Sequence, residues 1–480
     1  MKIQVYIFKI ILLIWFFIIF LPMITLAQLI SIKTVPIATG NQFLVFPSQN
    51  LGMGDVSIAV EDPLLDPFIN PAKGARIKGT VMFSSPVYYS ISNNIMSART
   101  LPIGALLSSD DLFGGFSLAI QQLGAANANN FQLLSEKYSN NMYASGMIGK
   151  RLPGSNISIA GGVFWAGLDA VDGVDLLYDR SQKIEQFGQM VDCRIGFLGE
   201  LGREHFYEGL LLLNRFNMEH DVTYVNQIWD DWDKQTRVER NLDHSNTVGL
   251  HFGYVMPLAD NGWLLGGILT GNWKSHPKIP NYELMNIPRD PGNSSAYNLG
   301  LGLSKTKEQV TLGIDLIYEP IWSNTWADAA EPVTTSSGRV IPIGGKTVEN
   351  DFRFSNKLLR IGIHRDEKLF GFQLGLQVRA IMYWLDQYNN VEGFRRKQKE
   401  HWSEWTPSWS LNLNFKEFQI RYTGRATMGT GRPGVSWSGF RRDLFFASSA
   451  DFIIAPSGPL TLQDARVMTH QISVVVPIRN

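Results

Sequence analysis

The residues of this chain that could do chemistry are charged side chains set into apolar, alternating segments. Asp192 and Arg194 occupy alternate positions of one such segment, and Arg421 and Arg425 occupy alternate positions of another. Side chains at alternate positions of a strand share a face, so each set would point away from the apolar face. They could form ion pairs that brace a wall, or a charged path that selects an ion or a solute. The charged residues placed in this way are Asp192, Arg194, Glu200, Asp315, Glu319, Arg379, Arg421 and Arg425.

Carboxylates also gather at Asp230, Asp231 and Asp233, in the stretch IWDDWDKQ, where oxygen ligands could hold Ca²⁺. The stretch lacks the glycine and the terminal glutamate of an EF-hand loop, which favours a solvated surface loop over a metal site. The eight histidines are scattered, and no pair has the H-E-x-x-H spacing of a zinc site. The sequence therefore predicts no metal and no other cofactor.

The sequence carries no local motif of a known enzyme class. There is no G-x-S-x-G and no P-loop, and the single cysteine, Cys193, cannot form an intramolecular disulfide. Cys193 lies between Asp192 and Arg194, so we predict that it faces the apolar side. The 43 basic and 43 acidic residues balance, which gives no sign of a nucleic-acid partner. We predict a protein that is not an enzyme, although a barrel hydrolase could assemble its site from distant strands.

Long segments with a period of two must position these charges. In FGFQLGLQVRAIMYW, from Phe370 to Trp384, every second residue is apolar and the residues between them include Gln373, Gln377 and Arg379. Such alternation is typical of a strand with one apolar and one polar face. The segments run to 11–15 residues, whereas a strand of a globular protein has about 5–6 and a tilted strand that crosses a bilayer needs about 9–11.

The connections between these segments alternate between short turns and long polar stretches, among them 217–245 and 385–402, as in outer-membrane barrels. Tryptophans bracket the apolar faces, as Trp263 and Trp273 do in GWLLGGILTGNW. Backbone groups in lipid must all be paired, and a closed barrel pairs them without leaving an edge. The sequence therefore predicts an all-β fold, a closed antiparallel transmembrane β-barrel of about 14–16 strands over residues 77–480.

The N-terminus predicts export. Lys2 and Lys9 flank the start of an apolar stretch, and small residues follow up to Ala27, as in a secretory signal peptide over residues 1–27. The alternative is a retained anchor, but the apolar run Ile10–Leu21 is short for a span of about 20 residues. With a barrel after it, the signal predicts the outer membrane of a Gram-negative-type bacterium as the location, with membrane lipid as a partner.

Between the signal and the first strand lies LGMGDVSIAVEDPLLDPFINPAKG, too rich in Gly and Pro for a regular helix or strand. Its Gly-Met-Gly, acidic and Asn-Pro-Ala elements resemble the N-terminal signature of the FadL-type outer-membrane superfamily, which includes hydrophobic-compound channels and the PorV/PorQ-type proteins of type IX secretion. The stretch departs from the pattern at Pro63–Leu65 and at Phe68-Ile69. The matching residues are Gly52, Gly54, Asp62, Asn70, Pro71 and Ala72.

The resemblance implies that residues 28–76 fold into the barrel lumen as a plug, or hatch. It implies one of two functions. The first is a passive, porin-like channel for hydrophobic small molecules, which would be its ligands. The second is a non-enzymatic partner of other proteins in an outer-membrane secretion complex. Substrate identity, hatch movement, oligomeric state and the role of the loop at 429–467 are left open by the sequence.

Overall fold

The computed structural model describes residues 30, 40–91, 96–125, 137–172, 183–202, 204–226, 235–259, 261–276, 292–329, 331–434 and 461–478. The predicted signal peptide, the Asp230–Asp233 stretch and most of the 429–467 loop lie outside these residues. No helix in the described residues is long and apolar enough to cross a membrane.

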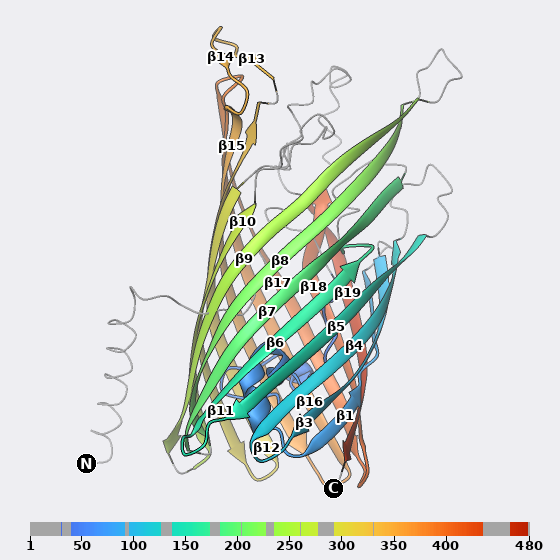
Figure 1. The fold of residues 1–480 in the computed structure, drawn as a ribbon, viewed down its shortest axis with the longest axis vertical. Helices are drawn as coiled ribbons and strands as arrows, with labels where there is room; N and C mark the ends of the chain where they lie inside the picture. Colours follow the sequence, from blue (N-terminus) through green and yellow to red (C-terminus); the bar gives the residue numbers. More distant parts are fainter. Residues whose placement is uncertain are drawn as a thin grey trace, which may run out of the picture.

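Strands dominate the fold and wind into one tilted, closed sheet (Figure 1). Every wall strand pairs antiparallel with its neighbours, and the last strand pairs with the first two. The strands are β1 (Thr80–Ser84), β2 (Val87–Ile91), β3 (Met96–Ser108), β4 (Leu112–Ala125), β5 (Lys137–Arg151), β6 (Ile157–Leu168), β7 (Lys183–Gly202), β8 (His205–Asn226), β9 (Gln235–Ala259), β10 (Trp263–His276), β11 (Gly292–Lys307), β12 (Val310–Asp328), β15 (Lys346–Asp366), β16 (Phe370–Asn389), β17 (Phe394–Asn414), β18 (Gln419–Gly434) and β19 (Thr461–Ile478).

The first wall strand is interrupted rather than doubled. Segments β1 and β2 both pair with β3 and with β19, and the register continues across Ser85 and Pro86 without a shift. Pro86 has no N–H to donate to a ladder, which explains the break. The 17 segments of the sheet therefore make a barrel of 16 strands. This confirms the predicted closed antiparallel transmembrane barrel.

The apolar faces of the strands point outward and the polar faces point into the barrel. On β16, Phe372 and Leu374 are exposed, whereas Gln373 between them is buried. Cys193 on β7 is exposed while Asp192 is buried, as the alternation predicted. An apolar outer surface is stable only against lipid, so the chain is an outer-membrane-type barrel. Other exposed apolar wall residues include Leu101, Ile103, Phe116, Leu118, Ile148, Ile195, Leu301, Leu316 and Leu411.

Several stretches that read as long polar loops are strands in the structure. Strands β16 and β17 continue to a tight turn at 390–393, although the sequence indicated a loop over 385–402. Likewise β8 and β9 extend far into the stretch 217–245. Polar residues occupy both faces there because the wall projects beyond the apolar belt. A small hairpin of β13 (Val333–Thr334) and β14 (Val340–Ile341) lies at the tip of this projecting end (Figure 1).

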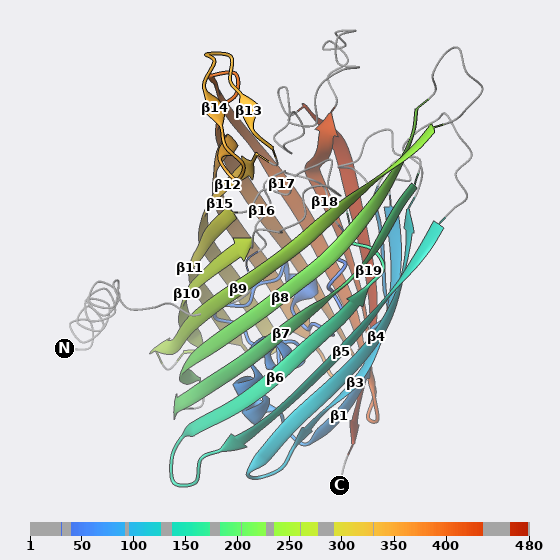
Figure 2. The same cartoon turned by 45° about the horizontal axis from the view of Figure 1, so that its top comes forward.

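Residue 30 and residues 40–78, which together we call the plug, lie inside the barrel (Figure 2). The plug contains the 3-10 helix η1 (Leu51–Met53), the one-turn helix α2 (Asp66–Ile69) and the 3-10 helix η2 (Pro71–Arg76). Helix η1 contacts β15, β16, β17 and β18, whereas η2 contacts β3 to β7 on another part of the wall. The plug thus spans the lumen between distant strands.

Candidate functional site

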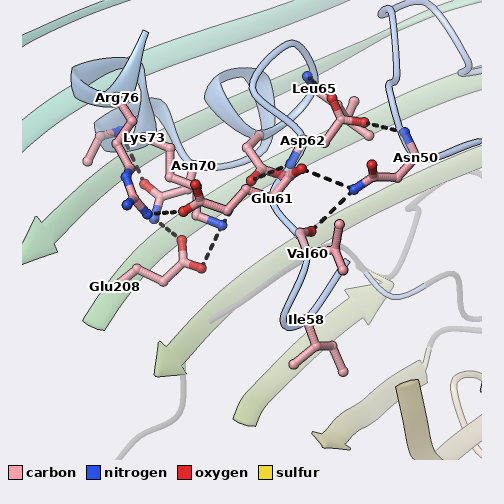
Figure 3. Close-up of polar contacts among 12 residues, drawn as sticks. Asn50, Ile58, Val60, Glu61, Asp62, Leu65, Asn70, Lys73, Arg76 and Glu208 are labelled. Carbon is pink, nitrogen blue, oxygen red and sulfur yellow. Dashed lines mark hydrogen bonds and ion pairs between the residues drawn. The ribbon is translucent and has the colours of Figure 1, made fainter. Parts of the chain in front are cut away.

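Asp62 ties together two arms of the plug (Figure 3). One of its carboxylate oxygens accepts hydrogen bonds from Ser48 Oγ at 2.7 Å and from the backbone N–H groups of Gln49 and Asn50 at 2.6 and 3.2 Å. The other oxygen accepts from the N–H groups of Leu64 and Leu65 at 3.2 and 3.1 Å. Asp62 is only 2% exposed, and it satisfies backbone donors that are buried or partly buried.

Gly52 and Gly54 let the backbone of the plug lie close against the wall. A Cβ on Gly52 would lie 2.5 Å from Ser410 Oγ, too close for any side chain. Gly54 has φ 71°, a left-handed conformation that glycine adopts without strain, and its N–H donates to Ser408 Oγ at 2.9 Å. The Gly-Met-Gly element therefore packs against the inner face of β16 and β17.

The Asn-Pro-Ala element packs against the opposite part of the wall. Asn70 caps η2 by accepting from the Ala72 N–H at 3.2 Å, and its amide donates to Glu208 Oε2 at 2.7 Å. Pro71 lies at the start of η2, where a missing N–H is not needed. A Cβ on Gly162 of β6 would lie 3.5 Å from Pro71 Cβ, so the element is in direct contact with the wall.

A buried ionic cluster joins this element to β8 and β9, and sequence reasoning missed it. The Lys73 ammonium lies 2.8 Å from Glu208 and 3.3 Å from Asp66, and His251 lies 3.9 Å from Glu208. Burial raises the pKa of Asp66 to about 6, against the opposing effect of Lys73. Burial alone would lower the pKa of Lys73, but the two carboxylates outweigh it and raise the pKa. The lysine therefore stays charged between its partners.

Arg194 holds the plug by its backbone. Its guanidinium pairs with Asp192 at 2.8 Å and donates to the carbonyl oxygens of Phe68 and Ile69 at 3.0 and 2.8 Å. These two carbonyls belong to the C-terminal end of α2, which is otherwise short of donors. A pair that looked in the sequence like part of the wall alone is therefore also a clamp on the plug.

Two further wall charges contact the plug from the other side of the barrel. Asp315 on β12 accepts from the N–H groups of Ser57 and Ile58 at 2.8 and 3.3 Å. Arg425 on β18 forms an ion pair with Asp55 at 2.7 Å. Both interactions bind the loop between Gly54 and Asp62, so this loop is anchored on separate strands.

The remaining predicted charges differ in their surroundings. Arg421 donates to the Ser48 carbonyl at 3.2 Å, and Glu200 lies 3.2 Å from Arg76, which also contacts Glu61. Glu319 instead pairs within the wall, accepting from the Asn356 amide at 2.8 Å. The Nε atom of Arg379 has no hydrogen-bond partner among the residues that the structure describes. Most of the charges therefore contact the plug, in addition to or in place of contacts with one another.

Uncharged side chains and one more arginine add contacts that the sequence did not single out. Arg360 donates to the Asp55 carbonyl at 3.1 Å, and Gln373 donates to the Gln49 carbonyl at 2.8 Å. Gln121 on β4 donates to the Gln42 carbonyl at 2.8 Å. Wall side chains thus satisfy backbone carbonyls along the length of the plug.

Two apolar clusters face the lumen rather than the lipid. The first gathers on β11, β12, β15 and β16, where the rings of Phe354 and Tyr383 are in tilted contact with centroids 5.1 Å apart and Trp402 packs beside them. Ile30 of the plug also belongs to this cluster. The second contains Tyr143, Phe164, Met190, Phe216 and Met218 and packs against Val45 and Phe46 of the plug. Apolar side chains of the plug therefore occupy both clusters.

We found no group of three or more potential metal ligands among the described residues. The acidic stretch at Asp230, Asp231 and Asp233 lies outside that part of the chain. The solvated loop that the sequence favours over a Ca²⁺ site therefore stays a prediction.

Replacing Glu208 with alanine is expected to loosen the plug. Within the described residues, the change would leave Asp66 as the ion-pair partner of Lys73 and would remove the Glu208 acceptor of the Asn70 amide. Breaking a buried ion pair in this way costs about 3–5 kcal/mol. We expect trypsin to cleave the folded variant at Lys73 or Arg76 at least tenfold faster than the wild type. A Glu349→Gln variant, which disrupts an exposed pair with Lys346, is the control; equal cleavage of both variants would refute a role for Glu208 in docking.

No protein-family model matches the chain, and no curated protein matches it. Among solved structures, a Pseudomonas aeruginosa FadL homologue matches with 8% identity and a TM-score of 0.48, over 93% of this chain and all of that one. The Ralstonia pickettii toluene transporter TbuX matches with 10% identity and a TM-score of 0.41, over 91% of this chain and all of that one. At these identities the likeness is one of fold.

Proposed function

We propose that the chain is a passive outer-membrane channel for hydrophobic small molecules, and that the plug is the hatch that opens it. The observation that carries the proposal is the presence of apolar clusters, including the two described above, on the inner face of the wall. A channel for ions needs no apolar residues on its inner face, whereas a hydrophobic solute needs apolar contacts along its path.

The packing of the clusters supports this proposal. In the structure, Ile30 and Val45 fill them with aliphatic side chains. A hydrophobic solute that displaced these side chains would gain the same kind of contact, at about 25 cal/mol for each Å² of apolar surface removed from water. The solute would therefore compete with the plug for the same inner surface.

The polar part of the plug–wall interface supports movement of the plug. Its anchors include hydrogen bonds from Arg194, Arg360 and Gln373 to carbonyl groups of the plug. Water can replace such partners when the plug moves, so each bond contributes only about 0.5–1.5 kcal/mol net, or up to about 3 where a charge takes part. Apolar side chains of the plug such as Phe46 and Phe68 must also leave their clusters, and a hydrophobic solute that takes their place would offset that cost.

Uptake of a labelled hydrophobic compound into cells that express the protein tests the channel. We expect toluene or a long-chain fatty acid to enter faster than into cells without it. A Phe354→Gln variant carries a polar side chain in the first inward-facing cluster. Because this side chain interrupts the apolar surface, the increase in uptake over cells without the protein should fall at least sixfold. Phe372→Tyr, on the outer face of β16, is the matched control. If no compound tested enters faster with the wild-type protein, the channel proposal fails.

One observation favours the second function, a partner role in a secretion complex. The β13–β14 hairpin is ordered at the projecting end, where Ser336 N–H donates to the Val391 carbonyl at 2.8 Å. Its residues Val340 and Ile343 are 54% and 69% exposed, which suits contact with another protein. A partner role predicts that the tagged chain co-isolates with an outer-membrane or secreted protein, that Ile343→Asp abolishes this, and that uptake is absent.

A further inference from the structure

The outer face of β15, β16 and β17 carries a cluster of cations just beyond the apolar belt. We call Arg353, Arg395, Lys397 and Lys399 the basic patch. Arg353 on β15 lies directly opposite Trp384 on β16, which lies opposite Lys399 on β17. Because neighbouring strands are about 4.8 Å apart, two cations flank one tryptophan within roughly 10 Å.

The patch faces outward and begins where the apolar belt ends. Along the outer face of β16, Phe370, Phe372 and Leu374 are exposed near the short-turn end, and Asp386 follows Trp384 near the other end. Tryptophan marks the membrane interface in such barrels, so residues beyond Trp384 lie at the depth of lipid headgroups. The side chains of Arg353 and Lys397 are 59% and 69% exposed, so both are accessible.

The charge of the patch is positive after its ion pairs are counted. Asp351 pairs with Arg353 at 2.9 Å, and Asp386 pairs with Arg395 at 2.6 Å. Lys397 is 3.8 Å from the same Asp386, and Lys399 lies over the Trp384 ring at 5.8 Å. Four cations against two carboxylates leave two positive charges. The nearby Glu349 adds no net charge because it pairs with Lys346 at 2.8 Å.

The corresponding extension of β8 and β9 has the opposite charge. In one ion-pair group of this extension, Arg240 lies 2.6 Å from Glu219 and 3.0 Å from Asp221. Two carboxylates against one cation give this group one excess negative charge. The projecting part of the wall is therefore not uniformly basic, and the positive charge is concentrated on one side of the barrel.

We propose that the basic patch binds the phosphate groups of a phosphorylated glycolipid in the outer leaflet. The projecting strands lie at the end opposite the short turns, which in such barrels is the outer side of the membrane. An arginine guanidinium matches a phosphate with two parallel hydrogen bonds, and a lysine adds a point charge. A phosphate above Trp384 would be reached by Arg353 from one side and by Lys399 from the other. This proposal rests on the membrane-spanning barrel and not on the channel function.

The test uses the purified full chain in detergent, titrated with diphosphoryl lipid A and followed by native mass spectrometry. We expect one lipid to bind the wild type, and we expect Arg353→Ser/Lys397→Ser/Lys399→Ser to weaken binding at least tenfold. Arg240→Ser is the control and should bind as the wild type does. Heat-modifiable migration on gels establishes that each variant is a folded barrel.

Two further arms identify the group that is recognised. Lipid A from which the phosphates have been removed should bind at least tenfold more weakly, and millimolar inorganic phosphate should not displace the intact lipid. The proposal is overturned if the wild type binds no lipid A, if the triple variant and the Arg240 control bind it equally, or if the dephosphorylated lipid binds as well as the intact one. Displacement by free phosphate would also overturn it, because the site would then recognise a solute and not a headgroup.

Discussion

Oxidising a cysteine pair at positions 71 and 162 is expected to stop uptake, and reduction is expected to restore it. A Cβ at Gly162 would lie 3.5 Å from the Cβ of Pro71, within the range of about 3.5–4.5 Å found in disulfides. The variant Pro71→Cys/Gly162→Cys, with the native Cys193 changed to serine, would join the plug to β6. If hydrophobic compounds pass only when the plug leaves its contacts, we expect at least a tenfold loss of uptake on oxidation.

The reduced form of the same protein is the first control, because it carries all three substitutions without the bond. The second control is the variant with Pro71→Cys alone, in the Cys193→Ser background, whose uptake should not respond to the oxidant. Equal uptake by the oxidised and reduced forms would show that the plug does not move as a hatch. That result would leave the channel itself to be judged by the uptake of the wild type.

Replacing Asp62 with alanine is expected to open the barrel to polar solutes. The change removes the acceptor of Ser48 Oγ and of four backbone N–H groups in buried or partly buried hydrogen bonds. Hydrogen bonds to a buried charge contribute about 1.5–3 kcal/mol each, and they are not additive. We expect the loss to be on the order of 4 kcal/mol, enough to release the loop between Ser48 and Leu65 from its docked conformation.

Conductance across planar lipid bilayers measures this effect. The wild type should be closed to ions for most of the recording, and Asp62→Ala should show long open periods at the same voltage. Asp351→Ala is a suitable control, because that carboxylate pairs with Arg353 on the outer surface and touches no part of the plug. An Asp62 variant as closed as the wild type would mean that the carboxylate does not hold the plug in place.

Which barrel side chains face lipid and which face the lumen could largely be predicted, because this orientation depends on local properties of each strand. Whether Phe372 faces lipid and Gln373 faces the lumen depends only on the alternation of the strand and on the solvent at each face. The ends of the strands were not predictable in the same way. In the extension of β8 the outer face carries Glu219 and Asp221 in place of apolar residues, while Met218 and Val222 on the inner face stay buried. The apolar-outside alternation is therefore lost there, although the hydrogen-bonded ladder continues to Asn226 and Gln235.

The contacts of the plug could be predicted only in part. Asp62, Asn70 and the two glycines were singled out by their resemblance to a signature. Their partners lie far along the chain. Glu208, which accepts a hydrogen bond from Asn70, is 138 positions later in the sequence. A local signal for Glu208 did exist. It shares the inward face of β8 with Leu210 and Leu212, and a lone carboxylate among buried leucines requires a cation or a donor nearby. The sequence does not say that Lys73 is that cation.

The order of events during assembly follows from where the plug makes its contacts. Phe46 accepts a hydrogen bond from Gln471 on the last strand, 425 positions later, while Gln42 accepts one from Gln121 on an early strand. The plug is synthesised before the barrel strands, but it cannot complete its contacts until β19 has closed the wall. Contacts of such long sequence separation form late in folding. We expect the docked plug to mark barrels that have closed, so protection of the plug from protease would report completed assembly rather than insertion alone.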